Sequence, residues 1–136
     1  MLLVDDYTRK TTIFFLRNYS KDFEDFKVYK EMVENEMDSK IKCLRSNNGG
    51  EFTSKEFMDY CSRHGIKRQF SVARTPQHNG VVERKNMTVQ GMAQTILMDS
   101  KLTNIFWTQV VHTIVHIQNR VILRKNIDKT PYELWK

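Results

Sequence analysis

The chain has 136 residues, a length that suits one domain with a modest hydrophobic core. Hydrophobic residues make up 40% of it and only 2 Pro and 5 Gly occur, which excludes disordered, collagen-like and linker compositions. No apolar run reaches the roughly 18 residues of a membrane span, and Asp5 and Asp6 interrupt the apolar start, so we expect no membrane partner and no signal peptide. Cys43 and Cys61 lie too far apart in sequence to form a metal knuckle, and two cysteines indicate a reducing compartment, the nucleus or cytoplasm, without secretion.

Positive charge is concentrated after residue 40. The net charge is +6 for the whole chain, −2 for residues 1–40 and +8 for residues 41–136. A basic surface attracts polyanions, although the solvated face of an ordinary basic protein carries the same pattern. The densest stretch, 63–85, contains one acid, Glu83, and the following cations: Arg63, Lys67, Arg68, Arg74, Arg84 and Lys85.

The first half of the chain alternates predicted strands and helices. Apolar and β-branched runs at 2–4 and 11–16 predict a hairpin, and apolar residues at helical spacing predict a helix over about 21–37 that Ser20 caps. Residues 41–44 predict a short strand before a turn with two glycines. Ser54 caps a predicted short helix, Gly65 suits its left-handed C-cap, and alternation over 66–72 predicts another strand.

The second half is predicted to be helical. A loop at 75–80 leads into a helix from about residue 81, and a second long helix is expected over about 104–119. Thr130, Pro131 and Glu133 have the spacing of a capping box and predict a short closing helix. The order β-β-α-β-α-β-α-α-α predicts one α/β domain over residues 1–136, with no visible domain boundary.

Two loops of this domain lie where α/β sheets gather ligands, one after a strand at 46–52 and one before a helix at 75–83. Together with their flanks they carry a set of ordered motifs: VDDYTR at 4–9, LRSNNGGEF at 44–52, TPQHNGVVERKN at 75–86 and TPYELW at 130–135. With these motifs the chain resembles the integrase catalytic core of copia-type LTR retrotransposons, a retroviral-type integrase within a Pol polyprotein. The resemblance covers nearly the whole chain, so chance agreement of one short motif does not explain it.

The resemblance implies an RNase H-like mixed sheet flanked by helices, with two Asp and one Glu holding two Mg²⁺ or Mn²⁺ ions. Glu83 corresponds to the last acid. The position of the middle acid, 36 positions earlier, holds Asn47. In the family the first acid lies on a central strand that precedes the VDDYTR motif, so we expect an N-terminally truncated core that lacks this strand and this acid.

The remaining acid is expected to bind metal weakly or not at all, because Mg²⁺ prefers anionic oxygen ligands. Without paired ions neither the attacking nor the leaving oxygen is stabilised, so we expect no strand transfer or 3′-end processing. Asn47→Asp alone should not restore activity, since the first acid would still be absent. Asp5 and Asp6 are candidates for a substitute acid, but Asp is a common turn residue and the turn role is favoured.

Nucleic-acid contact is the function expected to persist. Arg84 and Lys85 lie beside Glu83 and could contact phosphates. Just before the same helix the loop carries three further candidate contacts, Gln77, His78 and Asn79. The position four after Glu83 is Met87, where the family usually has a basic residue, which weakens this face.

Other chemically interesting residues are better explained by packing. His112 and His116 have the spacing of a metal-binding pair, but Thr113 replaces the acid of an HExxH motif, so packed or half-exposed histidines are favoured. Cys43 is expected in the core. Helical spacing favours packing over base stacking for the aromatic candidates Phe106, Trp107 and Trp135.

Three hypotheses follow. The first is an integrase core associated with DNA integration, contacting element ends and target DNA, possibly as a homo-oligomer, and impaired in catalysis. The second is a non-catalytic, basic DNA-binding remnant. The third is a decayed gene product without function. Strand-transfer assays and salt-dependent DNA binding distinguish them.

Overall fold

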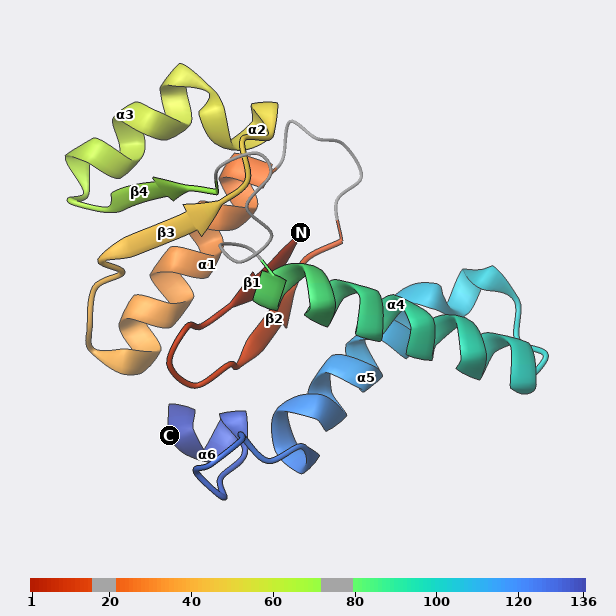
Figure 1. The fold of residues 1–136 in the computed structure, drawn as a ribbon. Helices are drawn as coiled ribbons and strands as arrows, with labels where there is room; N and C mark the ends of the chain where they lie inside the picture. Colours follow the sequence, from red (N-terminus) through yellow and green to blue (C-terminus); the bar gives the residue numbers. More distant parts are fainter. Residues whose placement is uncertain (16–21, 72–79) are drawn as a thin grey trace. The chain divides into compact units, whose positions relative to one another are not determined.

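The structure is a computed structural model that describes residues 1–15, 22–71 and 80–136 (Figure 1). It divides into two compact units. The terminal unit combines residues 1–15 with 81–136, and the central unit spans 16–80. Strands and helices occur in both units, which confirms the predicted α/β class.

The terminal unit begins with a β-hairpin. β1 (Leu2–Val4) pairs antiparallel with β2 (Thr11–Ile13), with Leu2 opposite Ile13 and Val4 opposite Thr11. Two further hydrogen bonds between Met1 and Phe14 extend this ladder beyond the strands. The second strand is shorter than the predicted 11–16, and position 16 lies outside the described residues.

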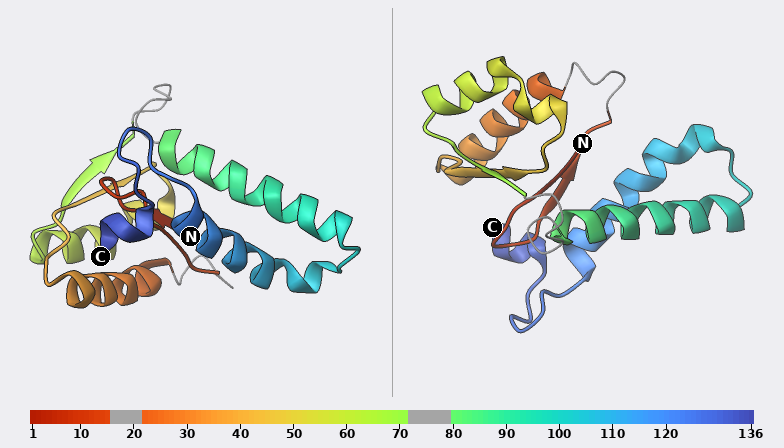
Figure 2. Two further views of the ribbon diagram at one scale, coloured as in Figure 1. Left: turned by 90° about the horizontal axis from the view of Figure 1, so that it is seen from below. Right: turned by 45° about the horizontal axis from the view of Figure 1, so that its top comes forward.

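Two long helices supply the core of this unit. α4 (Gly80–Asp99) and α5 (Trp107–Val121) run side by side, joined through the short 3-10 helix η2 (Asn104–Phe106), as both views of Figure 2 show. Val89 and Ala93 of α4 pack against Val111, Ile114 and Val115 of α5, as their helical spacing predicts. Ile13 of β2 joins the same cluster, together with Trp107 and Val110.

A buried side chain fixes α5 to the hairpin. Asn119 Oδ1 accepts from Thr11 N at 2.9 Å, and Asn119 Nδ2 donates to Thr11 O at 2.8 Å. Both residues are buried, so the amide satisfies two backbone groups on the open edge of β2 that water cannot reach. Asn119 therefore acts as a structural clamp between α5 and β2.

α6 (Pro131–Trp135) closes the terminal unit with the predicted capping box. Thr130 Oγ1 accepts from Glu133 N, and the Glu133 carboxylate accepts from Thr130 N at 2.8 Å. These hydrogen bonds to the backbone and side chain of Thr130 lower the pKa of Glu133. Trp135 is buried, with Lys10 Nζ 3.9 Å from its ring centroid, so α6 is held against the hairpin turn.

The central unit contains a parallel strand pair with helices. β3 (Cys43–Ser46) pairs with β4 (Lys67–Phe70), Ser46 lying opposite Phe70. α1 (Asp22–Met37), α2 (Gly50–Thr53) and α3 (Lys55–Arg63) complete the described part of this unit. Its most buried hydrophobic side chains are Phe26, Phe57, Cys61 and Ile66.

In the central unit, α3 is capped at both ends and α1 carries a partly buried ion pair. Ser54 Oγ accepts from Phe57 N, and Gly65 has φ +67°, as a left-handed C-cap requires. On α1, Lys30 Nζ lies 2.7 Å from Glu34 Oε2. Burial by itself raises the pKa of Glu34, but hydrogen bonds from Lys30 and from Ile41 N, with the charges of Lys30 and Lys40, outweigh it and lower that pKa.

Several sequence predictions need correction. Cys43 is exposed and Cys61 is the buried thiol, because β3 occupies residues 43–46 and not the predicted 41–44, and its pattern of burial changes accordingly. α2 was not predicted, and the Ser20 cap lies outside the described residues. The described strands form two two-stranded sheets, one antiparallel and one parallel. Among residues 1–15, 22–71 and 80–136, every helix is too short or too polar to cross a membrane.

Candidate active site and nucleic-acid interface

Asn47 lies in the loop that leaves the end of β3. Ser46 before it is buried, whereas the Asn47 side chain is exposed. Asn47 Oδ1 accepts from Gly49 N at 3.1 Å, which closes a short turn of the kind that Asp and Asn both form. An aspartate could make the same hydrogen bond, so Asn47 preserves the turn and removes only the negative charge.

Arg68 of β4 holds this loop in place. Its Nη2 donates to Ser46 Oγ and to Phe52 O, each at 3.0 Å. Its guanidinium carbon lies 4.7 Å from the Phe57 ring centroid and 4.9 Å from that of Phe70. The sequence analysis counted Arg68 among the cations of a basic surface, but the structure turns it inward. The signal was present in the alternation of 66–72, where Arg68 shares the apolar face of the strand.

Glu83 lies in the first turn of α4, and its side chain is exposed. Its carboxylate forms no hydrogen bond or ion pair with any described residue. Arg84 is exposed beside it, whereas Lys85 is half-buried, and this burial lowers the pKa of Lys85. Met87, four residues after Glu83, is 72% exposed, so an uncharged side chain faces solvent at this position of α4.

The described donor set does not fit a site for two divalent ions. Asn47 belongs to the central unit and Glu83 to the terminal unit, and each is described within its own unit. Across the described part of the chain no group of three or more His, Cys, Asp or Glu side chains could hold a metal ion. Of the two predicted metal positions, Glu83 offers a carboxylate, and Asn47 offers an amide oxygen that already accepts from a backbone N–H.

Asp5 and Asp6 are both turn residues, as the sequence favoured. Asp5 Oδ2 accepts from Thr8 N at 2.7 Å and from Thr8 Oγ1 at 2.8 Å. Asp6 Oδ1 lies 2.7 Å from Arg9 Nη1. Both carboxylates thus stabilise the β1–β2 turn, in which Arg9 has φ +66°.

The other predicted candidates separate into three groups. Gln77, His78 and Asn79 lie outside the described residues. His112 and His116 are both exposed; His112 packs on the Phe15 ring with centroids 5.2 Å apart, and His116 contacts Arg120. Trp107 and Trp135 pack as predicted, but Phe106 is 45% exposed because it lies in η2 and outside the regular helix.

The chain is similar to segments of plant retrotransposon polyproteins. It is 43% identical over 117 residues to the retrovirus-related Pol polyprotein from transposon TNT 1-94 of Nicotiana tabacum, a match that covers 86% of this chain and 9% of that protein. Those from transposons RE2 and RE1 of Arabidopsis thaliana are 35% and 32% identical over 121 residues, covering 89% of this chain and 8% of each. The chain therefore spans less than a tenth of the length of these relatives. No protein-family model matches it.

Solved structures with a similar fold are retroviral integrases. A chain of the simian T-cell lymphotropic virus intasome in complex with PP2A regulatory subunit B56 gamma matches with a TM-score of 0.78 and 15% identity, over 98% of this chain and 46% of that one. The HTLV-2 integrase catalytic core domain in complex with magnesium, known in trimeric and dimeric forms, matches with a TM-score of 0.72 and 18% identity, over 99% of this chain and 82% of that one. The chain is an integrase core-like region of a copia-type transposon Pol polyprotein, with the RNase H-like fold of integrase catalytic cores.

Proposed function

We propose that this chain contacts DNA in the course of DNA integration and does not itself catalyse phosphoryl transfer. The observation that carries the proposal is the neutral Asn47 at the end of β3, in a loop whose turn and supporting hydrogen bonds are otherwise built. The chain acts in the nucleus or cytoplasm, on element ends or target DNA, and could do so as a homo-oligomer.

The charge of the chain supports the DNA contact. Residues 41–136 have a net charge of +8, and Arg84 and Lys85 follow Glu83 on α4. The only described acid of the first turn of α4 is Glu83. Backbone phosphates are bound by such cations largely without regard to base sequence, so the expected binding is electrostatic and falls steeply with salt.

The side chains at positions 47 and 83 support the loss of catalysis. A Mg²⁺ or Mn²⁺ ion needs several oxygen ligands, and carboxylates neutralise its charge far better than an amide does. With Glu83 as the anionic ligand, we expect weak binding of Mg²⁺ or Mn²⁺. Without tightly held ions the oxygens of an in-line displacement are not stabilised.

A strand-transfer assay tests the catalytic part of the proposal. The chain is incubated with a duplex that carries a long-terminal-repeat end and a target plasmid, in Mg²⁺ or Mn²⁺, beside a Glu83→Gln variant. We expect no product above the level of the variant. Metal-dependent product from the wild-type chain that Glu83→Gln abolishes would overturn the proposed inactivity.

Binding of labelled duplex DNA tests the other part. We expect fluorescence anisotropy to show binding at low salt, with the logarithm of the association constant falling linearly with the logarithm of the salt concentration. Absence of binding at low salt would overturn the proposed DNA contact and would favour a decayed product.

A further inference from the structure

A basic hollow lies within the terminal unit. Its volume is about 410 Å³. The cations that line it are Arg9, Lys85, Arg124 and Lys125, and these four residues define the basic hollow. Arg9 comes from the β1–β2 turn, Lys85 from α4, and the other two from the segment after α5. Neither Asn47 nor Glu83 lines it.

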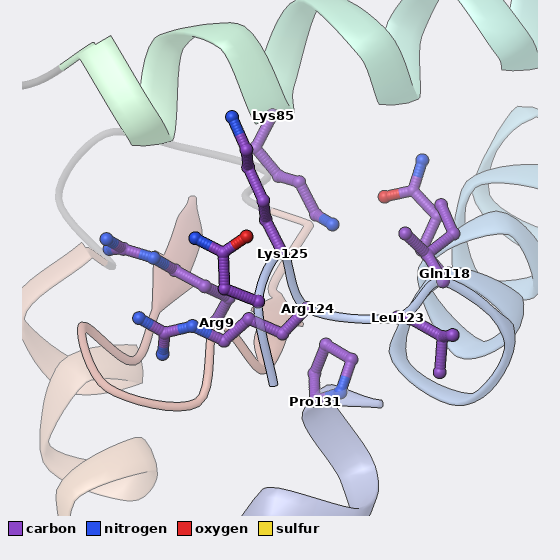
Figure 3. A pocket seen from close by; sticks show the side chains of 9 residues that line it. Arg9, Lys85, Gln118, Leu123, Arg124, Lys125 and Pro131 are labelled. Atoms are coloured by element: carbon purple, nitrogen blue, oxygen red, sulfur yellow. The ribbon is translucent and has the colours of Figure 1, made fainter. Parts of the chain in front are cut away.

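The four cations converge on one space. Figure 3 shows Lys85 pointing from α4 toward the segment after α5, and Lys125 pointing back toward α4. The guanidinium groups of Arg9 and Arg124 lie beside each other on one side. Among the described residues, no acidic side chain lines the hollow. Convergent like charges without an acid produce a positive potential that attracts an anion.

Three of these four cations have no anionic partner among the described residues. Arg9 pairs with Asp6, which is itself exposed. Lys85 and Lys125 form no hydrogen bond or ion pair with any described residue. Arg124 Nη1 is buried without a hydrogen-bond partner in the described part of the chain, although its guanidinium lies 5.6 Å from the Tyr7 ring centroid. Three of the four cations thus carry a charge that no described acid neutralises, which favours an anion in this space.

The backbone after α5 presents these side chains by a tight turn. Arg124 N donates to Lys129 O at 2.7 Å, and Ile127 N donates to Arg124 O at 3.1 Å. Asn126 and Asp128 have φ values of +68° and +53°, which this reversal of the chain requires. The positions of Arg124 and Lys125 are therefore set by the turn.

A neighbouring hollow extends the cationic lining along α4. It has a volume of about 250 Å³, shares Lys85, Gln118 and Ile122 with the basic hollow, and adds Arg84. Two hollows in sequence, lined by cations and by the apolar Ile122, suit a chain of phosphates joined by sugars better than one small anion. Arg forks bind phosphate oxygens in pairs, and Lys contributes point charges.

The geometry points to the basic hollow as a phosphate-binding site that holds the backbone of a bound polynucleotide. The inference rests on the proposed DNA contact and assigns it to residues of which only Lys85 was anticipated from the sequence. Gln118 lines the same space, and its Oε1 is buried without a partner among the described residues.

The test compares two variants that each lose two positive charges. Arg124→Gln/Lys125→Gln removes half of the site, and Lys55→Gln/Lys101→Gln is the matched control at exposed positions outside it. Binding of labelled duplex DNA is measured by anisotropy over a series of salt concentrations. Each lost phosphate contact should reduce the salt slope by about one unit, so the site variant should lose about two units and bind about tenfold more weakly at moderate salt. The control should stay close to wild type.

The outcomes separate this inference from the proposed function. If the wild-type chain binds DNA and both double variants weaken it equally, the site assignment is wrong while the DNA contact stands. If the wild-type chain does not bind DNA, the proposed function and this inference both fail. Lys85→Gln provides a single substitution should the double variant not fold, and it should lower the slope by about one unit.

A titration with inorganic phosphate distinguishes the source of the anion. Amide resonances of residues 124–126 are followed by NMR as phosphate replaces chloride at constant ionic strength. Shifts in these amides together with site-dependent DNA binding support the inference. Shifts with phosphate but no difference between the variants in DNA binding would identify a site for a free anion and overturn the polynucleotide assignment.

Discussion

Asn119→Ala should be strongly destabilising because the clamp on β2 consists of two buried hydrogen bonds. Asn119 is 6% exposed and Thr11 is 2% exposed. The alanine leaves Thr11 N–H and C=O without the partners at 2.9 and 2.8 Å. A buried polar group left unsatisfied costs roughly 1–3 kcal/mol. Two such groups, partly satisfied by water that enters the space left by the side chain, should lower the free energy of unfolding by about 2–4 kcal/mol. This is a large part of the roughly 5–15 kcal/mol that stabilises a typical domain.

Urea unfolding followed by far-UV circular dichroism measures this loss, with linear extrapolation to zero denaturant. The matched control is Asn86→Ala, where an exposed amide on α4 accepts from Gln90 Nε2 at 3.2 Å. That variant should change the free energy of unfolding by less than about 0.5 kcal/mol. If Asn119→Ala also stayed within that range, while the Thr11 amide kept its protection from hydrogen exchange, the clamp would contribute nothing to stability and the reasoning would be refuted.

Three further predictions concern the central unit. Arg68→Met should lower the free energy of unfolding by about 2–3 kcal/mol, because it removes charged hydrogen bonds to the loop. The control is Arg45→Met, which removes an exposed hydrogen bond to Gln69 and should cost less than about 0.5 kcal/mol. Similar losses in both variants would contradict the role of Arg68 in holding the loop. Because the folded pKa of Glu34 lies below its ordinary value of 4.5, its stabilising effect is present above that pH and is lost as pH falls through the folded pKa. Glu34→Gln should therefore lower the free energy of unfolding at pH 7, and the difference between variant and wild type should become smaller as the pH falls. If that difference were the same at pH 7 and pH 3, the ion pair with Lys30 would not be the cause of the lost stability. Asn47→Asp should tighten Mn²⁺ binding measured by calorimetry, since a carboxylate is the better ligand, and unchanged affinity would show that position 47 does not reach the ion.

Signals confined to one element were read correctly from the sequence. The capping box at Thr130 and Glu133, the Ser54 cap and the left-handed Gly65 all depend on residues at most a few positions apart. The apolar faces of α4 and α5 were equally predictable, because Val89, Ala93, Val111 and their neighbours recur at helical spacing. The local sequence determines these features, and contacts with residues far away in the sequence change them little.

Features that depend on long-range pairing were not predictable. Cys43 is exposed because the pairing of β3 with β4 starts there, and no local pattern sets that register. The clamp of Asn119 on Thr11 joins residues 108 positions apart. The basic hollow is likewise lined by Arg9 and Arg124, which lie near opposite ends of the sequence. At the candidate active site, the sequence indicated 47 and 83 as the candidate metal positions. It did not predict that Arg68 would hold the loop in place by hydrogen bonds.

The substitution at position 47 separates two roles that one side chain can combine. An aspartate at the end of β3 would close the turn with Gly49 N and also offer charge to a metal ion, and Asn47 performs only the first. The loop therefore keeps its shape, with Arg68 holding Ser46 and Phe52 in place, although its ligand chemistry is altered. Because either residue satisfies the turn, the same loop geometry accommodates both an aspartate and an asparagine at position 47. Under the proposed function, the missing charge at position 47, and not a change in the geometry of the loop, is what weakens metal binding.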